Sequence, residues 1–266
     1  MAQGIEIFSL RGKTALVTGA TGHLGATMAR ALSEAGAHVL INSRSSERTG
    51  SLTQQLIDSG GSAEPAVFDV TDQSAIAQFF ATRLHRPMHI LINNAYLGGA
   101  GSIELSDAGS YADSYNITVT AAHNLVKAAL PCLRQAIRND GDASIINLAS
   151  MYAMVSPNRS TYDSSGAMNP PFYGAAKAAL LQWTRYAACE FGAEGIRVNA
   201  ISPGPFPSES VQEKQSEFIR TLASKVPMAR IGHSDEISGP LLFLASSASS
   251  FVNGANIVVD GGWTCW

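Results

Sequence analysis

A tyrosine and a lysine stand four residues apart in the segment PFYGAAKAALLQW. Tyr173 and Lys177 fall on one face of the predicted helix, because residues i and i+4 are neighbours there. A free phenol has a pKa of about 10, too high for ready proton exchange at neutral pH. A neighbouring ammonium favours the phenolate and lowers that pKa, as general acid/base catalysis requires. The pair predicts proton transfer, although this spacing alone is common in helices.

Three glycines follow the first apolar run, in TALVTGATGHLGATMARAL. Their place between a strand and a helix lets the backbone approach a pyrophosphate at the helix N-terminus. A glycine-rich turn without a nucleotide is the alternative. The residues of this turn that we expect to bind a cofactor are Gly19, Thr21, Gly22, His23, Leu24 and Gly25.

The second predicted strand ends without a carboxylate. In the dinucleotide fingerprint, an acid about 20 residues on binds the ribose 2′-hydroxyl. Here Ser43 and Arg44 stand instead, so nothing repels a 2′-phosphate and a guanidinium can pair with one. This favours NADP(H), with NAD(H) as the second choice. The alternative is that Arg44 is only a solvated charge.

Short apolar runs alternate with helical patterns along the whole chain. The runs are continuous, which is typical of strands that helices cover on both faces. The alternation predicts an α/β fold: a single doubly wound Rossmann-type domain, 1–266, with a parallel sheet of about seven strands. The expected strands are 14–18, 38–42, 64–68, 89–93, 144–148, 197–201 and 256–260, and the expected helices are 24–35, 47–58, 73–84, 110–137, 173–191 and 235–247.

Two segments do not fit this alternation. Residues 151–172 are polar and carry three prolines, and residues 203–225 open with Pro-Gly-Pro-Phe-Pro. Both follow the carboxyl ends of predicted strands, where open α/β sheets bind ligands. We expect an active-site loop at 151–172 and a substrate lid at 203–225.

The composition limits the classes of partner. The chain has 266 residues, of which 45% are hydrophobic and 15% charged, and a formal net charge of −3 without a basic cluster. It therefore predicts a sizeable core, no nucleic-acid partner and no membrane partner. Three distant cysteines read as reduced core residues, six histidines show no metal-ligand spacing, and there is no G-x-S-x-G elbow. A cytoplasmic protein without a metal is expected.

With these motifs in order, the chain resembles the short-chain dehydrogenase/reductase family over nearly its whole length. The matching motifs are the TG turn (18–25), DV (69–70), NNA (93–95), Asn116 in SYNITVT, Ser150 in INLAS, Tyr173 with Lys177, SPG (202–204) and VDGG (259–262). The resemblance implies hydride transfer between the cofactor and a carbonyl or alcohol.

The resemblance also implies residue roles. Tyr173 gives a proton to the carbonyl oxygen, and Ser150 hydrogen-bonds that oxygen. Lys177 lowers the tyrosine pKa and binds the nicotinamide ribose, and Asn116 holds a water that relays protons from Lys177. Further cofactor contacts fall to Asp69 and Val70 near adenine, Asn93, Ala95, Pro203, Gly204 and Phe206 near ribose and nicotinamide, and Ser208 near the carboxamide.

The chain departs from the family pattern at two single positions. His23 replaces the middle glycine of the short branch, which gives the spacing of the extended branch. Too few residues follow Lys177 for that branch's second domain, so we assign the short branch, with His23 as a helix cap or a pyrophosphate contact. Tyr96 replaces the glycine of NNAG, and either narrows the nicotinamide side or points outward.

A third departure is the distance from Ser150 to Tyr173, about twice that of the family pattern. The segment between them is rich in hydroxyl and amide groups, among them Ser156, Asn158, Arg159, Ser160, Thr161, Tyr162, Asp163, Ser164, Ser165 and Asn169. Such a lining suits a hydroxylated or sugar-like substrate better than a steroid or acyl chain. The alternative is a solvated surface loop that does not touch substrate.

The sequence thus predicts an NADP(H)-dependent oxidoreductase. One alternative is a 3-oxoacyl-thioester reductase, with Lys214, Arg220, Lys225 and Arg230 near its entrance. Another is a non-catalytic NADP(H)-sensing regulator. A homodimer or homotetramer is predicted from two long helices with few charges, 110–137 and 173–191, and from two tryptophans in VDGGWTCW that we expect to be exposed.

Overall fold

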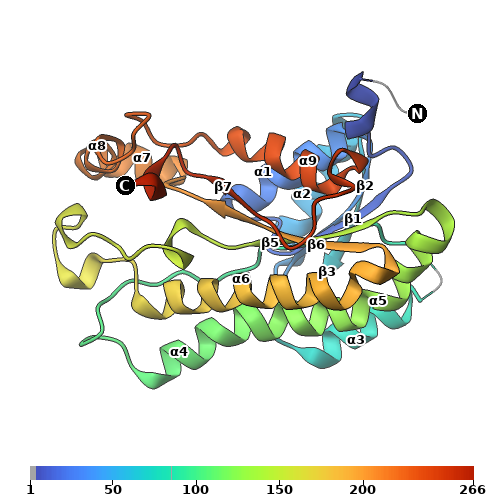
Figure 1. The fold of residues 1–266 in the computed structure, drawn as a ribbon, viewed down its shortest axis with the longest axis horizontal. Helices are drawn as coiled ribbons and strands as arrows, with labels where there is room; N and C mark the ends of the chain where they lie inside the picture. The colour runs from blue at the N-terminus through green and yellow to red at the C-terminus, as the bar shows by residue number, and fades with distance from the viewer. Residues whose placement is uncertain (1–3, 85) are drawn as a thin grey trace.

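Seven parallel strands form one sheet in the computed structural model, which describes residues 4–84 and 86–266 (Figure 1). Their order is β3-β2-β1-β4-β5-β6-β7. The order reverses between β1 and β4, and open α/β sheets bind ligands at such a switch point. The strands are β1 (Thr14–Val17), β2 (His38–Ser43), β3 (Ser62–Val67), β4 (Ile90–Asn93), β5 (Ala143–Leu148), β6 (Ile196–Pro203) and β7 (Asn256–Val259).

Helices cover both faces of the sheet, so the predicted doubly wound fold is confirmed. Helices α1, α2 and α9 lie on one face, and α3, α5 and α6 on the other (Figure 1). No helix of the described ranges has the length and apolar character to cross a membrane. The helices are α1 (His23–Glu34), α2 (Ser46–Asp58), α3 (Gln73–Ala81), α4 (Ala108–Tyr115), α5 (Ala121–Asp140), α6 (Pro171–Phe191), α7 (Glu209–Lys214), α8 (Ser216–Ser224) and α9 (Ser238–Ala245).

The helix predicted over 110–137 is interrupted. Between α4 and α5, residues Asn116–Thr120 form a π turn, in which the Ala121 N–H donates to the Asn116 carbonyl five residues back. Such turns widen a helix locally and are frequent at functional sites. The interruption therefore falls at a residue that the sequence analysis singled out.

The expectation that helices cover every strand on both faces is wrong for the two edge strands. β3 and β7 end the sheet, and Val67 and Val258 on them are 47% and 41% exposed. An apolar run thus does not by itself prove burial, because an edge strand has a neighbour on one side only.

Two expectations about single side chains also need correction. Only Cys132 is buried, whereas Cys189 and Cys265 are exposed. Trp266 is exposed as expected, but Trp263 is buried against Met151, Tyr152 and Leu222. The C-terminal turn therefore belongs to the core beside the candidate site.

The residue before β4 anchors the strand that leads to the candidate site. The His89 Nδ1 atom accepts a hydrogen bond from the Thr14 N–H (3.0 Å), so its proton is on Nε2, which donates to Asp140 Oδ2 (2.6 Å). The ring is buried, and that burial lowers the pKa of His89 despite the Asp140 hydrogen bond. The folded protein therefore holds His89 neutral.

This neutral histidine predicts a loss of stability in mild acid. The unfolded state binds a proton below about pH 6.5, while the folded state resists it, so stability is lost as the pH falls below that value. Thermal unfolding midpoints between pH 8 and pH 5.5 should fall more steeply for the wild type than for His89→Gln. Parallel curves for the two proteins would contradict the prediction.

Candidate active site

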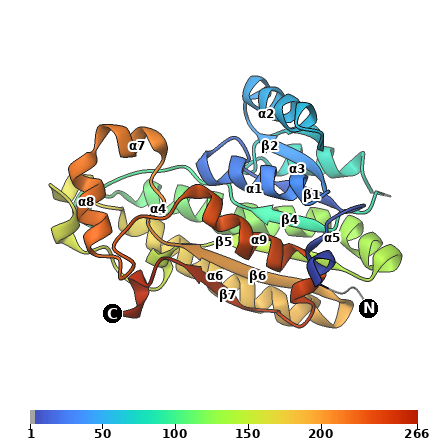
Figure 2. The same ribbon diagram turned by 90° about the horizontal axis from the view of Figure 1, so that it is seen from above.

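The carboxyl ends of the central strands gather most of the predicted site residues. The glycine turn follows β1, Asn93–Tyr96 end and follow β4, Ser150 follows β5, and Pro203–Ser208 end and follow β6. Tyr173 and Lys177 face them from the first turns of α6. The segment 151–172, drawn in yellow-green to yellow, lies at the same end of the molecule as α7 and α8 (Figures 1 and 2).

Close contacts inside the protein explain two of the three glycines. Gly19 has φ +60°, and a Cβ there would lie 2.9 Å from the Ala95 Cα. A Cβ on Gly25 would collide with the Gly19 carbonyl oxygen. Gly22 is exposed at the N-cap of α1 and has only the Gly19 oxygen near it. It therefore leaves the backbone at the helix N-terminus open to an anion.

Thr18 and Asn94 hold this turn, and the sequence analysis did not assign them a role. The Thr18 Oγ1 atom accepts hydrogen bonds from the N–H groups of Asn94 (2.9 Å) and Ala95 (3.1 Å). The Asn94 side-chain amide donates to the carbonyls of Thr18 (2.9 Å) and Gly19 (3.2 Å). The available signal was the second asparagine of NNA, a polar residue directly after a buried strand.

Asn93, which is predicted to contact the ribose, also makes hydrogen bonds inside the protein. Its amide donates to Asn147 Oδ1 (2.8 Å), and the Asn147 amide donates to Thr184 Oγ1 (2.8 Å). These bonds link β4, β5 and α6 inside the protein. Asn93 and Ala95 also line a small cavity beside Lys177.

Arg44 and Asp69, which are predicted to bind the adenosine part of the cofactor, line a groove of about 450 Å³ together with Thr71 and Asn116. Arg44 is exposed, and its Nη1 lies 3.8 Å from Asp69 Oδ2. Burial alone would raise the pKa of Asp69, but hydrogen bonds from Thr71 and the Arg44 charge outweigh it and lower that pKa. A guanidinium and a carboxylate thus share this end of the groove.

Ser43 and Val70 lie inside the protein next to this groove. The Ser43 hydroxyl lies 2.6 Å from Thr49 Oγ1 and 3.1 Å from the Ser45 carbonyl oxygen. Val70 is buried in the core. Arg44 is therefore the member of the Ser43–Arg44 pair that reaches the groove.

Ser150, Tyr173 and Lys177 come together between β5 and α6. The Ser150 hydroxyl lies beside the Tyr173 phenol and acts to lower its pKa, and the Ser150 Oγ accepts a hydrogen bond from the Tyr152 N–H (3.1 Å). Lys177 is 4% exposed, and its Nζ donates to the Leu148 carbonyl (2.5 Å). Asn116 lies apart from this cluster on the wall of the groove.

The net pKa of Tyr173 is raised in this structure, whereas a lowered pKa was expected. Burial raises the pKa of Tyr173, and the group that opposes the rise is Ser150. The Lys177 Nζ lies 5.8 Å from the centre of the Tyr173 ring. Burial lowers the pKa of Lys177 itself to about 8, because desolvation disfavours the charged form.

Tyr96 points inward. Its ring meets the Tyr173 ring edge to face, with centroids 4.7 Å apart and an interplanar angle of 68°. Of the two orientations left open by the sequence, the structure shows the one that places the phenol in the Tyr173–Lys177 cluster.

His23 does not cap α1. The N-cap is Gly22, and no side chain makes a capping hydrogen bond there. His23 is half-buried, and burial lowers its pKa while the Glu209 charge on α7 acts to raise it. The side chain thus stands between the glycine turn and the 203–225 segment.

The 151–172 segment connects two walls of the site. On one side the Gly101 N–H donates to the Met168 carbonyl (2.9 Å). On the other side, Lys225 Nζ donates to Ser160 Oγ (2.7 Å). The Tyr162 ring packs on the Phe218 ring of α8, with centroids 5.8 Å apart. A pocket of about 520 Å³ lies along its inner side, lined by Ser102, Glu104, Tyr152, Ser156, Arg159 and Asn169.

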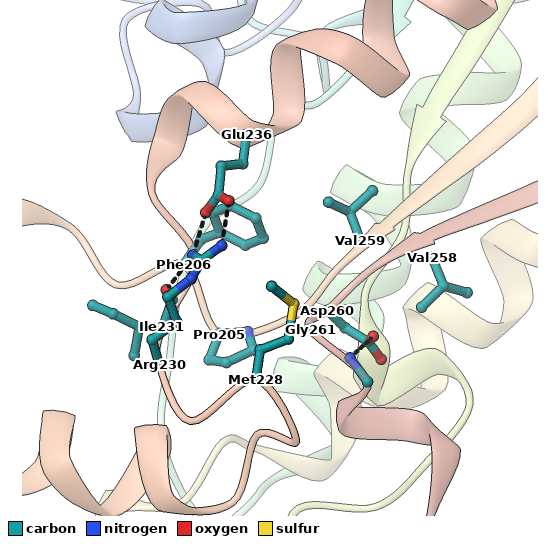
Figure 3. A pocket seen from close by; sticks show the side chains of 12 residues that line it. Pro205, Phe206, Met228, Arg230, Ile231, Glu236, Val258, Val259, Asp260 and Gly261 are labelled. Carbon is teal, nitrogen blue, oxygen red and sulfur yellow. Dashed lines mark hydrogen bonds and ion pairs between the residues drawn. The ribbon is translucent and has the colours of Figure 1, made fainter.

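Pro205 and Phe206, at the start of the 203–225 segment, line another pocket of about 280 Å³ (Figure 3). Residues that follow this segment and residues at the end of β7 line the rest of it. There Phe206 faces Arg230, which forms two hydrogen bonds with Glu236 (2.7 and 2.6 Å). A Cβ on Gly204 would lie 2.5 Å from the Asp260 Cα, so this glycine allows close approach to the end of β7. Ser208 is half-buried at the start of α7.

Comparison with known proteins gives full-length matches. A family model described as Enoyl-(Acyl carrier protein) reductase matches residues 19–264. The chain is 34% identical over 263 residues to the gluconate 5-dehydrogenase of Gluconobacter oxydans (strain 621H), covering 97% of each chain. It is 32% identical over 265 residues to the galactitol 2-dehydrogenase (L-tagatose-forming) of Cereibacter sphaeroides, covering 98% of each.

Among solved structures, the fold resembles a gluconate 5-dehydrogenase from Burkholderia cenocepacia J2315 in complex with NADP and tartrate. The two chains are 30% identical, the TM-score is 0.86, and the match covers 98% of each chain.

The contact of Gly25 with Gly19 predicts the effect of adding one methyl group. Gly25→Ala should push α1 away from the turn, lower stability by about 1–3 kcal/mol and weaken NADPH binding by at least about tenfold. Gly50→Ala is the control, since Gly50 lies in α2 with nothing within 4 Å. That variant should be neutral or gain up to about 1 kcal/mol. Calorimetry measures the stability and titration measures the NADPH affinity of each variant. Equal stability and equal affinity in the two variants would contradict the role given to the Gly25–Gly19 contact.

Proposed function

The chain belongs to the short-chain dehydrogenase/reductase family, and we propose that it interconverts a carbonyl group and a secondary alcohol, with NADP(H) as cofactor. The observation that carries this proposal is the cluster of Ser150, Tyr173 and Lys177 beside the glycine turn. Ser150 follows β5, and Tyr173 and Lys177 come from α6, so the three meet at the carboxyl ends of the central strands.

The residues present fit NADP(H). The N-terminus of α1 at Gly22 would hold the pyrophosphate, Arg44 the 2′-phosphate, and Asp69 the adenine. Thr21, Leu24, Asn93, Ala95, Pro203 and Ser208 stay cofactor contacts in this proposal. When bound, the cofactor supplies or accepts the hydride.

The protein's own task is then to hold the carbonyl and move a proton. Ser150 would donate a hydrogen bond to the carbonyl oxygen as negative charge develops on it. Tyr173 would transfer its phenolic proton to the same oxygen, and its raised pKa keeps it protonated at neutral pH. The Lys177 ammonium would stabilise the phenolate left behind. Asn116, on the groove wall, would order a water in proton exchange with Lys177.

A hydroxylated or sugar-like substrate is the class that we favour. The named relatives act on gluconate and galactitol, and a solved relative was crystallised with tartrate. The pocket beside the 151–172 segment carries hydroxyl, amide and guanidinium groups. Such groups can replace the hydrogen bonds that a polyol makes with water.

The thioester reductase has less support from the structure. Of the four basic residues considered for a carrier protein, Lys225 already donates to Ser160 and Arg230 is paired with Glu236. The non-catalytic NADP(H)-sensing regulator also has less support, because Ser150, Tyr173 and Lys177 are all present. Ser150 lies beside Tyr173, and Lys177 donates to the carbonyl of Leu148, the last residue of β5.

We further propose one catalytic domain, 1–266, with 151–172 at the substrate mouth and 203–225 as a lid. A homodimer or homotetramer through α4–α5 and α6 remains our prediction for the assembly, since Tyr115 and Tyr186 on these helices are 49% and 68% exposed. The cytoplasmic location is likewise a prediction.

Removing the phenolic hydroxyl tests the proposal. Tyr173→Phe should lower kcat for carbonyl reduction by about 10²–10⁴ and leave NADPH binding intact, because the ring is retained. The assay is NADPH oxidation with a panel comprising a polyhydroxylated keto acid, a keto sugar, a small apolar ketone and a 3-oxoacyl thioester. Wild-type turnover by the Phe variant would reject the role of Tyr173. A preference for the thioester would reject the substrate class.

The exposed guanidinium in the groove predicts the cofactor preference. Ser43→Asp combined with Arg44→Ala should weaken NADPH binding by about ten- to a hundredfold, the worth of a charge-assisted hydrogen bond, and change NADH binding less. Arg48→Ala, on the exposed side of α2, removes one positive charge outside the groove and is the control for the loss of the Arg44 charge. Equal NADPH affinity in the wild type and the double variant would show that Arg44 is only a solvated charge.

A further inference from the structure

Tyr96 is a side chain whose place the family pattern does not explain. It follows Ala95 directly, and the Ala95 N–H is bonded to Thr18 Oγ1 (3.1 Å). The backbone that carries the ring is thus fixed to the end of β1. At the tip of the side chain, the Tyr96 hydroxyl is buried beside Ser114 of α4. Ser114 in turn donates to the Phe172 carbonyl (3.2 Å), next to Tyr173. The ring therefore spans the space from β4 to the start of α6.

Two groups of the candidate site lie against this ring. The Tyr173 ring meets it edge to face, with centroids 4.7 Å apart. The Lys177 Nζ lies 5.4 Å from the Tyr96 centroid and 5.8 Å from that of Tyr173. An ammonium within about 6 Å of an aromatic centroid is attracted to the ring, more strongly where water is excluded.

Lys177 has few other sources of stabilisation. It donates to the Leu148 carbonyl, and no carboxylate in residues 4–84 or 86–266 forms an ion pair with it. The titratable groups that reach it are the two phenols, and burial is the cause of its lowered pKa. Two aromatic rings and one carbonyl therefore hold a buried cation.

The Tyr96 hydroxyl does not take part in this arrangement. It has no hydrogen-bond partner among the described residues, and burial raises the pKa of Tyr96 to about 12. It is therefore neutral at neutral pH and makes no hydrogen bond with Ser150, Tyr173 or Lys177. What the side chain offers to the cluster is the ring.

We propose that Tyr96 is a positioning residue: its ring holds the Lys177 ammonium in place and fixes the orientation of the Tyr173 ring. The proposal rests on the proposed function for its catalytic consequence, and on the contacts alone for its effect on Lys177. A glycine at this position would leave the ammonium with one ring and an open space.

The first test measures Lys177 in the free protein, without substrate or cofactor. The chain has five lysines, so NMR of 13C-lysine-labelled protein can follow each one, with Lys177→Met to assign the signal. Tyr96→Leu, which keeps bulk but removes the π face, should lower the Lys177 pKa by about half a unit. Tyr96→Phe should leave the Lys177 pKa at its wild-type value and leave the unfolding midpoint equal or slightly higher, because only an unpartnered hydroxyl is lost.

A matched control lies nearby. Tyr111 of α4 meets Phe172 edge to face, with centroids 5.9 Å apart, but no cation–π contact involves it in the described chain. Tyr111→Leu removes a comparable aromatic pair and should not change the Lys177 pKa. If Tyr96→Leu does not fold, Tyr96→Met is the replacement and carries the same expectation.

The second test follows the reaction. In Tyr96→Leu, kcat for carbonyl reduction should fall by about tenfold, with the KM for NADPH within about twofold of wild type. The alkaline limb of the kcat profile should move to lower pH together with the Lys177 pKa. Tyr96→Phe should restore both kcat and the profile.

The outcomes separate the two proposals. An unchanged Lys177 pKa in Tyr96→Leu, or equal damage in Tyr96→Leu and Tyr96→Phe, overturns the role of the Tyr96 ring. If the Lys177 pKa moves as expected but the wild type reduces none of the carbonyl substrates, the proposed function fails and the contact of Tyr96 with Lys177 stands.

Discussion

The hydroxyl of Thr18 ties together the two strand ends on which the site depends. It accepts hydrogen bonds from the N–H groups of Asn94 and Ala95, and donates to the Ile92 carbonyl (3.0 Å). β1 and β4 are neighbours at the point where the strand order reverses, so this contact fixes the glycine turn against the segment that carries Tyr96. Gly19 has no room for a side chain because of that same closeness. The glycine turn and the aromatic ring beside Tyr173 and Lys177 therefore share one anchor.

Burial shifts the pKa values of Tyr173 and Lys177 in opposite directions. It raises the pKa of Tyr173 and lowers the pKa of Lys177 to about 8, since a low-dielectric site disfavours a phenolate and an ammonium alike. Tyr173 consequently keeps its proton at neutral pH, while Lys177 is charged for most of the time. The protein maintains this charge with the Leu148 carbonyl and two ring faces rather than with a carboxylate. An anionic partner would neutralise the ammonium that a developing phenolate requires.

The segments around the proposed substrate pocket contact one another. The 151–172 segment bonds to the loop after β4 through Met168 and to the 203–225 segment through Ser160 and Tyr162. Its first residues, Met151 and Tyr152, pack with Leu222 and Trp263. The 151–172 segment is therefore held by contacts with both of the neighbouring segments.

Local patterns identified the fold, and together with the family resemblance they identified the principal chemical groups. The i and i+4 spacing of Tyr173 and Lys177, the strand–helix alternation and the glycine turn each depend on residues close in the chain. Contacts between distant residues were decided only by the tertiary structure. Thr18 and Asn94 are 76 residues apart, Gly204 meets Asp260, and Trp263 packs on Met151 and Tyr152. The direction of Tyr96 and the sign of the Tyr173 pKa shift belong to the same group, because both depend on which distant side chains surround a residue and on how much water they exclude.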